Sequence, residues 1–361
     1  MVTKINNPVC SFNEWDRLEE TIVGRLENAM FPSWDYILKN TIPTEALPFY
    51  EDLFSMKGKP VPDAIIDKAN EDLEQFIAIL KREGVTVHQP DVFEFSKKFS
   101  SPFWNVESGV STANPRDVFF VVGNLIIECP MADRGRYFEM FPYRNILNSL
   151  FLRGAKWISA PKPMLKDSLY NNYSRLANGF SINEEEITFD AADFVRCDNH
   201  IIGQLSHVTN SKGVKWLESV LGEEYKIHLI DTACPEALHI DTTIMPLNEN
   251  TLLVNAAFLN PQKIPTFFKD WNIIIAPKPH SFTTTVGNYK IVSDWMSMNM
   301  LSLDSKTVIV EEKQKAMIQT LKKAGFSVIP CPFENYYLFG GSFHCATLDL
   351  RRKCNLKSKS K

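Results

Sequence analysis

The sequence contains side chains that can carry nucleophilic and acid–base chemistry, and they recur at one kind of position. A thiol, an imidazole, a hydroxyl and several carboxylates each stand just before, or close to, a predicted strand that opens a structural unit. Such groups form a reactive site when a fold brings a nucleophile within hydrogen-bond reach of a proton-transfer group. The six candidates are Asp117, Asp190, His239, Asp241, Ser293 and Cys345.

Each candidate has a simpler explanation when it is taken alone. An aspartate before a strand is most often a turn or cap residue. His239 alone would suit a structural histidine, and Cys345 alone a small buried apolar residue. Packing does not require reactive residues at equivalent points of diverged repeats, so their recurrence favours a shared site. If the units surround an axis, all six side chains point toward it.

The elements that must position these residues begin with four predicted β-hairpins. Each has strand-like residues on both sides of a short polar turn, and a helix is predicted after each. The hairpins run from Val118 to Ile127, from Phe194 to Leu205, from Thr243 to Val254 and from Met300 to Val310.

A short apolar run follows each helix, and the spacing of these runs indicates a repeat. The runs begin near Val85, Lys156, Tyr225, Asn272 and Phe326. Separations of roughly 45 to 70 residues are typical of repeat architectures. Five units are therefore predicted. The first unit is complete only if residues 20–24 pair with residues 343–350, which would join the chain ends and remove a sheet edge.

Five segments together resemble the arginine:glycine amidinotransferase family. They occur in the family's order, and the match extends from about Pro8 to Arg352. The segments are PVCSFNEWDRLEETIVG from Pro8, NPRDVFFVVGN from Asn114, FDAADFVR from Phe189, HIDTT from His239 and GGSFHCATLDLRR from Gly340.

The resemblance implies an α/β fold that agrees with the unit count. The family fold is a five-bladed α/β propeller of ββαβ modules with pseudo-fivefold symmetry, shared by the guanidine-modifying enzyme superfamily. By similarity, Cys345 is the nucleophile, His239 is the general acid and base, and Asp190 orients His239.

The resemblance also implies how substrate is bound. Asp117 and Asp241 resemble the carboxylates that hold a guanidinium, and Ser293 resembles a serine that contacts substrate. These roles are chemically reasonable, because a guanidinium is protonated at any ordinary pH and pairs well with carboxylates. Its carbon reacts only with a strong nucleophile such as a thiolate.

The implied reaction is amidino transfer from L-arginine to a primary amine. Cys345 would carry the amidino group covalently while ornithine leaves, and two half-reactions predict ping-pong kinetics. Glycine, lysine and a natural-product precursor amine are all compatible acceptors. No cofactor is expected, and the family suggests a homodimer.

The sequence departs from the family where the donor carboxylate is expected to bind. An NPxR stretch would provide an arginine, but this chain reads VNAAFLNPQK, which places Phe258 or, with a gap, Lys263 near that position. A lysine meets a carboxylate as a point charge without the arginine fork, and phenylalanine cannot meet it at all. We therefore expect the donor carboxylate to be held differently.

Two other functions are compatible with parts of the sequence. An arginine deiminase-like hydrolase would use the same thiol, imidazole and carboxylates, with water attacking the amidino-cysteine. The motifs SFHC and DAAD resemble the transferases more than the EGGD pattern of deiminases. A non-catalytic propeller that only binds ligands is disfavoured by the joint presence of Cys345, His239 and Asp190.

Composition sets the remaining expectations. With 361 residues, 44% of them apolar, residues 1–361 can form a single propeller domain with a flexible tail from about residue 355. A net charge of −4 without a basic, aromatic-interleaved stripe argues against nucleic-acid binding. No apolar run approaches the length of a membrane span, and no metal-ligand spacing is present, so neither a membrane nor a metal is expected.

Several residues have expected structural roles. Seven cysteines without disulfide-like spacing suggest a reducing, cytoplasmic location, with all but Cys345 as ordinary thiols.

His344 would face away from Cys345 if both lay in a strand, which favours packing. Apolar residues between Ala64 and Lys81 recur at helical spacing and predict an amphipathic helix packed on the core. Gly340 and Gly341 suit either a turn or close approach to substrate.

Overall fold

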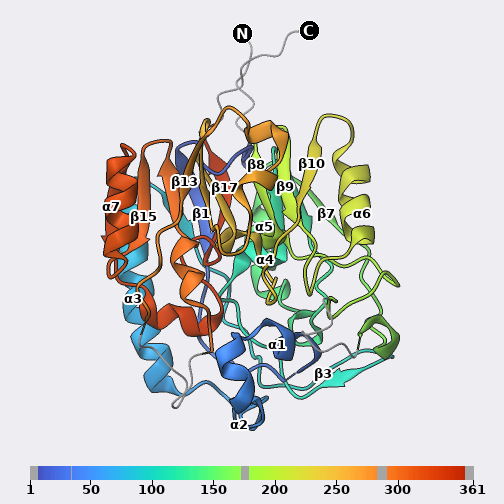
Figure 1. Cartoon of the computed structure of the whole chain (residues 1–361). Coiled ribbons are helices and arrows are strands. Elements are labelled where there is room, and N and C mark those ends of the chain that lie inside the picture. The colour runs from blue at the N-terminus through green and yellow to red at the C-terminus, as the bar shows by residue number, and fades with distance from the viewer. Residues whose placement is uncertain (1–6, 34, 172–178, 283–290, 354–361) are drawn as a thin grey trace.

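The computed structural model describes residues 7–33, 35–171, 179–282 and 291–353, and its strands form five three-stranded sheets (Figure 1). In four sheets an antiparallel hairpin is followed by a third strand that pairs in parallel with the second strand of the hairpin, and in the remaining sheet the antiparallel pair joins strands from the two ends of the chain. The five-unit α/β propeller predicted from the sequence is confirmed. The tail predicted from about residue 355 lies outside the described residues.

Each of these sheets has the second strand of its antiparallel pair at the centre. The sheets are β17–β1–β2 (Thr347–Arg352, Leu18–Val23, Thr86–His88), β5–β6–β7 (Phe119–Val122, Leu125–Glu128, Lys156–Ser159), β8–β9–β10 (Phe194–Cys197, His200–Gln204, Lys226–Ile230), β11–β12–β13 (Ile244–Asn248, Thr251–Val254, Asn272–Ile275) and β14–β15–β16 (Leu301–Asp304, Thr307–Glu311, Ser327–Cys331). A separate two-stranded sheet joins β3 (Phe99–Ser100) to β4 (Asn105–Val106).

The hairpin turns use residues that tolerate a left-handed backbone. Gly123 has φ 58° between β5 and β6, and Asp198 has φ 60° between β8 and β9. Two-residue hairpin turns need such angles because they match the twist of the flanking strands. The four hairpins therefore form where the sequence predicts them.

The first sheet is completed by the two ends of the chain. β1 pairs antiparallel with β17, with Ile22 opposite Leu348 and Val23 opposite Thr347. The predicted closure is confirmed, but β17 begins at Thr347 because residues 343–346 form a turn. Cys345 lies in that turn rather than in the strand.

Helices connect the second and third strands of four sheets. They are α3 (Asp63–Arg82), α5 (Arg144–Leu152), α6 (Ser211–Leu221) and α7 (Lys315–Lys323).

The fourth sheet is an exception to the predicted helix after every hairpin. The fully described stretch between β12 and β13 contains two 3₁₀ turns, η8 (Pro261–Lys263) and η9 (Thr266–Phe268). A proline removes a backbone donor and clashes with the preceding turn of a helix. Pro261 and Pro265 therefore prevent a continuous helix in this stretch.

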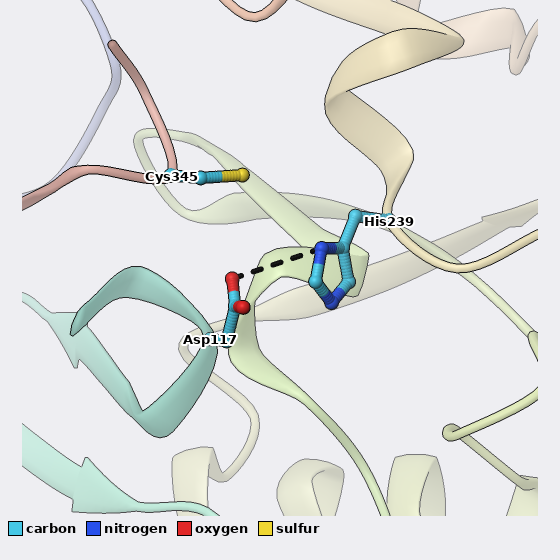
Figure 2. Close-up of side chains that lie close together, drawn as sticks. All are labelled: Asp117, His239 and Cys345. Carbon is cyan, nitrogen blue, oxygen red and sulfur yellow. Dashed lines mark ion pairs between the residues drawn. The ribbon is translucent and has the colours of Figure 1, made fainter. Parts of the chain in front are cut away.

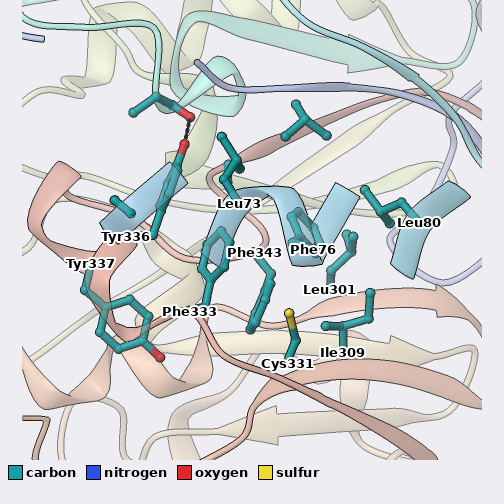
Figure 3. Close-up of a cluster of buried hydrophobic side chains, with 14 of the residues drawn as sticks. Leu73, Phe76, Leu80, Leu301, Ile309, Cys331, Phe333, Tyr336, Tyr337 and Phe343 are labelled. Carbon is teal, nitrogen blue, oxygen red and sulfur yellow. Dashed lines mark hydrogen bonds between the residues drawn. The ribbon is translucent and has the colours of Figure 1, made fainter. Parts of the chain in front are cut away.

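The largest apolar cluster packs α3 against the segment that leads into Cys345 (Figure 3). The predicted amphipathic helix is confirmed, with Leu73, Phe76 and Leu80 buried on its inner face. Phe343 stacks on Phe333 with ring centroids 4.3 Å apart and packs against Phe76 at 5.1 Å. This packing fixes the turn that contains Cys345.

A short helical segment lies between β1 and α3. It consists of α1 (Asp35–Thr41), η1 (Thr44–Phe49) and α2 (Tyr50–Phe54), and Figure 1 shows α1 and α2 below the sheets. Ile42, Ala46 and Tyr50 form a small apolar cluster within it. We call residues 35–54 the helical cover.

The cysteines differ from expectation at one position. Cys10 is disulfide-bonded, so the prediction of an ordinary thiol is wrong there. Disulfide formation depends on proximity in space, which sequence spacing alone does not reveal. Cys129, Cys197, Cys234 and Cys331 carry thiols rather than disulfides, as expected.

None of the helices in the described residues is long and apolar enough to cross a membrane.

Replacing Phe76 with alanine should lower the free energy of unfolding by about 3–5 kcal/mol, because the side chain is fully buried between aromatic rings. Urea denaturation followed by fluorescence measures the change. Phe151→Ala, the same substitution at a position that is 57% exposed, is the matched control and should change stability by less than about 1 kcal/mol. Equal losses for the two variants would contradict this assignment of the core.

Candidate active site

A short helical turn precedes the first strand of four sheets, and these turns carry the candidate residues. Asp117 lies in α4 (Pro115–Val118) before β5, and Asp190 caps η6 (Ala191–Asp193) before β8. His239 and Asp241 lie at η7 (Ile240–Thr242) before β11. Because these turns stand at the same end of neighbouring sheets, their side chains converge.

Asp117, His239 and Cys345 come from three sheets and meet in the interior (Figure 2). One nitrogen, oxygen or sulfur atom from each lies within 4.8 Å of the others. His239 Nδ1 is 3.7 Å from Asp117 Oδ1, and His239 Nε2 is 3.3 Å from Asp190 Oδ2. The structure thus brings the thiol, the imidazole and two carboxylates together.

Asp241 lies on the other side of the thiol. Cys345 Sγ donates to Asp241 Oδ2 at 3.3 Å. Asn299 Nδ2 donates to the same carboxylate oxygen and to Sγ, each at 2.8 Å. Asn299 Oδ1 accepts from the backbone N–H of Cys345 at 3.0 Å. Asn299 therefore holds the thiol and the carboxylate in one arrangement.

Asn299 is a site residue that was not predicted from the sequence, although a signal for it was present. Asn299 stands directly before the strand pair that begins at Leu301, the position that identified the other candidates. Ser293 lies earlier, at the start of η10 (Asp294–Met298), where its hydroxyl accepts from the Trp295 N–H at 3.2 Å. Ser293 also lines the cavity above Cys345.

The prediction that His344 mainly serves packing is wrong. Its ring is buried, with Nδ1 2.9 Å from Asp241 Oδ2 and Nε2 3.2 Å from Glu14 Oε2. The alternation of a strand does not apply, because His344 and Cys345 lie in a turn. The ring links the active-site carboxylate to Glu14 from the start of the chain.

A buried ion-pair network lies behind His344. Arg196 Nη2 is 2.7 Å from Glu14 Oε2 and 2.7 Å from Asp349 Oδ2. Arg116 Nη2 is 2.8 Å from the other oxygen of Asp349. Although burial acts to raise the pKa of Glu14, Arg196 and the other cations hold it well below its usual range. Glu14 therefore stays anionic against the His344 ring.

The electrostatics of the site favour a charged imidazole and a neutral thiol. Burial acts to lower the pKa of His239, but Asp117, Asp190 and Cys345 together raise it well above its usual value. Burial, followed by the charges of Asp241 and Asp117, raises the pKa of Cys345 to about 12, although His239 opposes this. The thiol is therefore protonated at neutral pH in the free protein.

Arg136 lies among the carboxylates on the far side of His239. Its Nη1 is 2.9 Å from Asp117 Oδ2 and 3.6 Å from Asp190 Oδ2, and its guanidinium also pairs with Glu139. Burial nevertheless leaves the pKa of Asp117 above its ordinary value, even though His239 and Arg136 lower it.

Three buried carboxylate oxygens retain unused hydrogen-bonding capacity. Within the described residues, one oxygen each of Asp117, Asp190 and Asp241 accepts no hydrogen bond. A buried acceptor without a donor is costly, so such oxygens suit a ligand rich in N–H groups.

A cavity of about 280 Å³ opens onto the reactive groups. Cys345, His239, Asp241 and Ser293 line it, whereas Asp117 and Asp190 lie outside its lining. Of the two candidate replacements for the expected arginine, Phe258 lines the cavity and Lys263 is exposed elsewhere.

The structure explains why glycine stands at both positions 340 and 341, shortly before Cys345. Gly340 adopts φ 80° at the end of η11 (Glu334–Phe339) and lines the cavity. A Cβ on Gly341 would lie 2.4 Å from Asn114 Oδ1 and 2.6 Å from Cys345 Cβ. The expected turn is therefore present, and Gly341 is required by close packing against Asn114 and Cys345, whereas approach to substrate stays a prediction.

The cluster of Asp117, His239 and Cys345 also has the atom types of a metal site. Zinc binds thiolate, imidazole and carboxylate, and catalytic zinc sites commonly use three protein ligands. The absence of a metal therefore stays a prediction from the sequence.

No family model matches the chain. Individual proteins do match over nearly its whole length. It is 43% identical over 357 residues to the L-arginine:L-lysine amidinotransferase of Pseudomonas savastanoi pv. phaseolicola, an alignment that covers 98% of this chain and 96% of that protein. It is 38% identical over 366 residues to the mitochondrial glycine amidinotransferase of Xenopus laevis, covering 97% and 84%.

A solved structure agrees with these relatives. SxtG, an amidinotransferase from Microseira wollei in the saxitoxin biosynthetic pathway, is 50% identical, with a TM-score of 0.91 and coverage of 97% of this chain and 99% of that one. These similarities cover nearly the whole of this chain. The protein therefore belongs to the amidinotransferase family and is an amidinotransferase.

Proposed function

We propose that the protein transfers the amidino group of L-arginine to a primary amine through a covalent amidino-Cys345. The observation that supports this most directly is a buried thiol between an imidazole and carboxylates whose oxygens lack hydrogen-bond donors. The names of two relatives give arginine with lysine, and glycine, as their substrates.

The donor's guanidinium would bind between Asp117 and Asp241. Both carboxylates are buried beside Cys345, and each has an oxygen able to accept an N–H from the substrate. A cation placed between them would offset the charges that raise the pKa of Cys345. The thiol would then ionise when the donor is bound, which confines the reactive thiolate to the occupied site.

The first half-reaction would form a bond from Cys345 Sγ to the guanidinium carbon. The tetrahedral adduct would collapse by breaking the bond to the δ-nitrogen, which takes a proton from His239 and leaves as ornithine. In the second half-reaction, His239 would accept a proton from the incoming amine. The amine nitrogen would then bond to the amidino carbon, and the C–S bond would break to release the Cys345 thiolate, which regains a proton from solvent.

Asp190 would orient His239 and stabilise its charged form. The contact of 3.3 Å joins Asp190 Oδ2 to Nε2, while Nδ1 faces Asp117. A carboxylate serves imidazole in this way in other nucleophile–imidazole–acid sites. Ser293 at the cavity wall is proposed as a substrate contact.

Other properties follow from the family and from composition. We propose one propeller domain over residues 1–361, a homodimer and a cytoplasmic location. The five free cysteines among the described residues support a reducing environment, although the Cys10 disulfide does not. No cofactor enters the proposed chemistry.

Incubation with L-arginine alone should add an amidino group to Cys345 and release ornithine, and Cys345→Ala should abolish both. Intact mass, peptide mapping and amino-acid analysis measure these products. Cys331→Ala, which removes a buried thiol in the apolar core, should retain the adduct. Citrulline instead of ornithine would favour the hydrolase, and an active Cys345→Ala would exclude the mechanism.

Asp190→Asn should reduce kcat by about 10²- to 10⁴-fold while leaving arginine binding largely intact, because the ring loses its orienting charge but the guanidinium carboxylates remain. Steady-state kinetics and calorimetric titration with arginine separate the two effects. Asp270→Asn, at a side chain that is 84% exposed, is the control. Loss of binding with unchanged kcat would assign Asp190 to substrate binding instead.

Alkylation of Cys345 by iodoacetamide in the free enzyme should be slow at pH 7 and rise about tenfold per pH unit toward pH 12, because only the thiolate reacts. Peptide mass spectrometry follows the rate. The alkylation rate of N-acetylcysteine, which has an ordinary thiol, should level off near pH 9. A Cys345 rate that also levels off there would show that the free site already ionises the thiol.

A further inference from the structure

The cavity above Cys345 has two unlike parts. Its reactive part is polar and contains Cys345, His239 and Asp241. Most of the remaining lining is aliphatic or aromatic, including Phe258, Leu338 and other side chains from separate elements. A molecule that reaches the thiol therefore lies mainly against apolar surface.

The helical cover supplies much of this apolar wall. Leu38, Ile42, Tyr50 and Phe54 line the cavity and also belong to the cover's own apolar cluster. The rings of Tyr50 and Phe54 stack with centroids 5.5 Å apart. Because the same side chains hold the cover together, the wall is a packed surface and not a chance group of exposed residues.

The charges around the cavity disfavour an anionic group. Among the described lining residues, the acidic and basic side chains are Glu236, His239 and Asp241, and none is a lysine or arginine. Glu236 is tied to the cover by a hydrogen bond from Thr44 Oγ1 at 2.6 Å. Phe258 lines the cavity, and it or, with a gap, Lys263 stands where the family pattern has an arginine. A carboxylate in the wall region would meet apolar carbon, neutral hydroxyl groups such as those of Thr41 and Ser111, or Glu236.

Donor and acceptor depend on this wall to different degrees. The donor has a guanidinium that the buried carboxylates can hold. The acceptor has only a small reacting amine, so the rest of its structure must supply its affinity. Each methylene group transferred from water to an apolar surface improves binding by about fourfold.

We propose that the acceptor is a primary amine carried on an apolar body without a carboxylate, rather than glycine or lysine. This inference rests on the proposed function. The neutral amine nitrogen would bond to the carbon of amidino-Cys345, the C–S bond would break, and the amine proton would pass to His239. The products are a substituted guanidinium, the Cys345 thiolate and protonated His239, so atoms and charge balance.

Matched acceptors test the inference with the wild-type enzyme. Enzyme supplied with L-arginine is given n-hexylamine or 6-aminohexanoate, which share a chain and differ by a carboxylate, and also glycine or lysine. Mass spectrometry measures each guanidino product and the loss of amidino-Cys345. We expect kcat/KM for n-hexylamine to exceed that for 6-aminohexanoate and glycine by at least about tenfold, and to rise with chain length by up to about fourfold per methylene from propylamine to hexylamine.

A second measurement uses the wall itself. Phe54→Ala should reduce the ratio of kcat/KM for n-hexylamine to that for 6-aminohexanoate by about three- to tenfold, because it removes apolar lining. Phe49→Ala is the control, since Phe49 lies in the same cover, is 44% exposed and is not part of the cavity lining. It should leave the ratio unchanged.

The outcomes separate the two proposals. If amidino-Cys345 does not form with arginine, the proposed function fails. If it forms but glycine, lysine or 6-aminohexanoate discharges it as fast as or faster than the alkylamines do, only the acceptor inference is overturned. An equal ratio in Phe54→Ala and wild type would likewise overturn the role of the wall.

Discussion

The pairing of β1 with β17 is the constraint on which the rest of the structure depends. This antiparallel contact joins the two ends of the chain and completes the first of the five sheets. It places the turn with Cys345 beside residues from the start of the chain, including Glu14, which meets His344. Cys345 is thus held from both sides, by the aromatic packing of Phe343 and by the polar contacts of Asn299.

The active site concentrates negative charge where water is excluded. Asp117, Asp190 and Asp241 are buried together, and His239 and Arg136 offset only part of their charge. In the proposed function a guanidinium would suit this site, because it offers both the charge and the N–H donors that buried carboxylates require. In the free protein, burial and the charges of Asp241 and Asp117 raise the pKa of Cys345.

The cavity walls differ in chemistry from its reactive part. Relatives named for arginine with lysine and for glycine align with nearly the whole chain. Phe258 and the helical cover give this cavity an apolar wall. These lining residues lie on segments between strands, where side chains can differ among proteins that share a fold.

Local sequence determined the hairpins, the third strands and α3, because turn residues and apolar periodicity are local signals. The local sequence also indicated candidate site positions, because they recur just before predicted strands. The repeat pattern predicted a helix before β13, but Pro261 and Pro265 prevent it and two 3₁₀ turns form instead. Tertiary structure alone decided the contacts of His344 and Asn299 with Asp241, the disulfide of Cys10 and the apolar cavity wall. Each of these depends on residues far apart in the chain, and their distances are set only when the five sheets close into a ring.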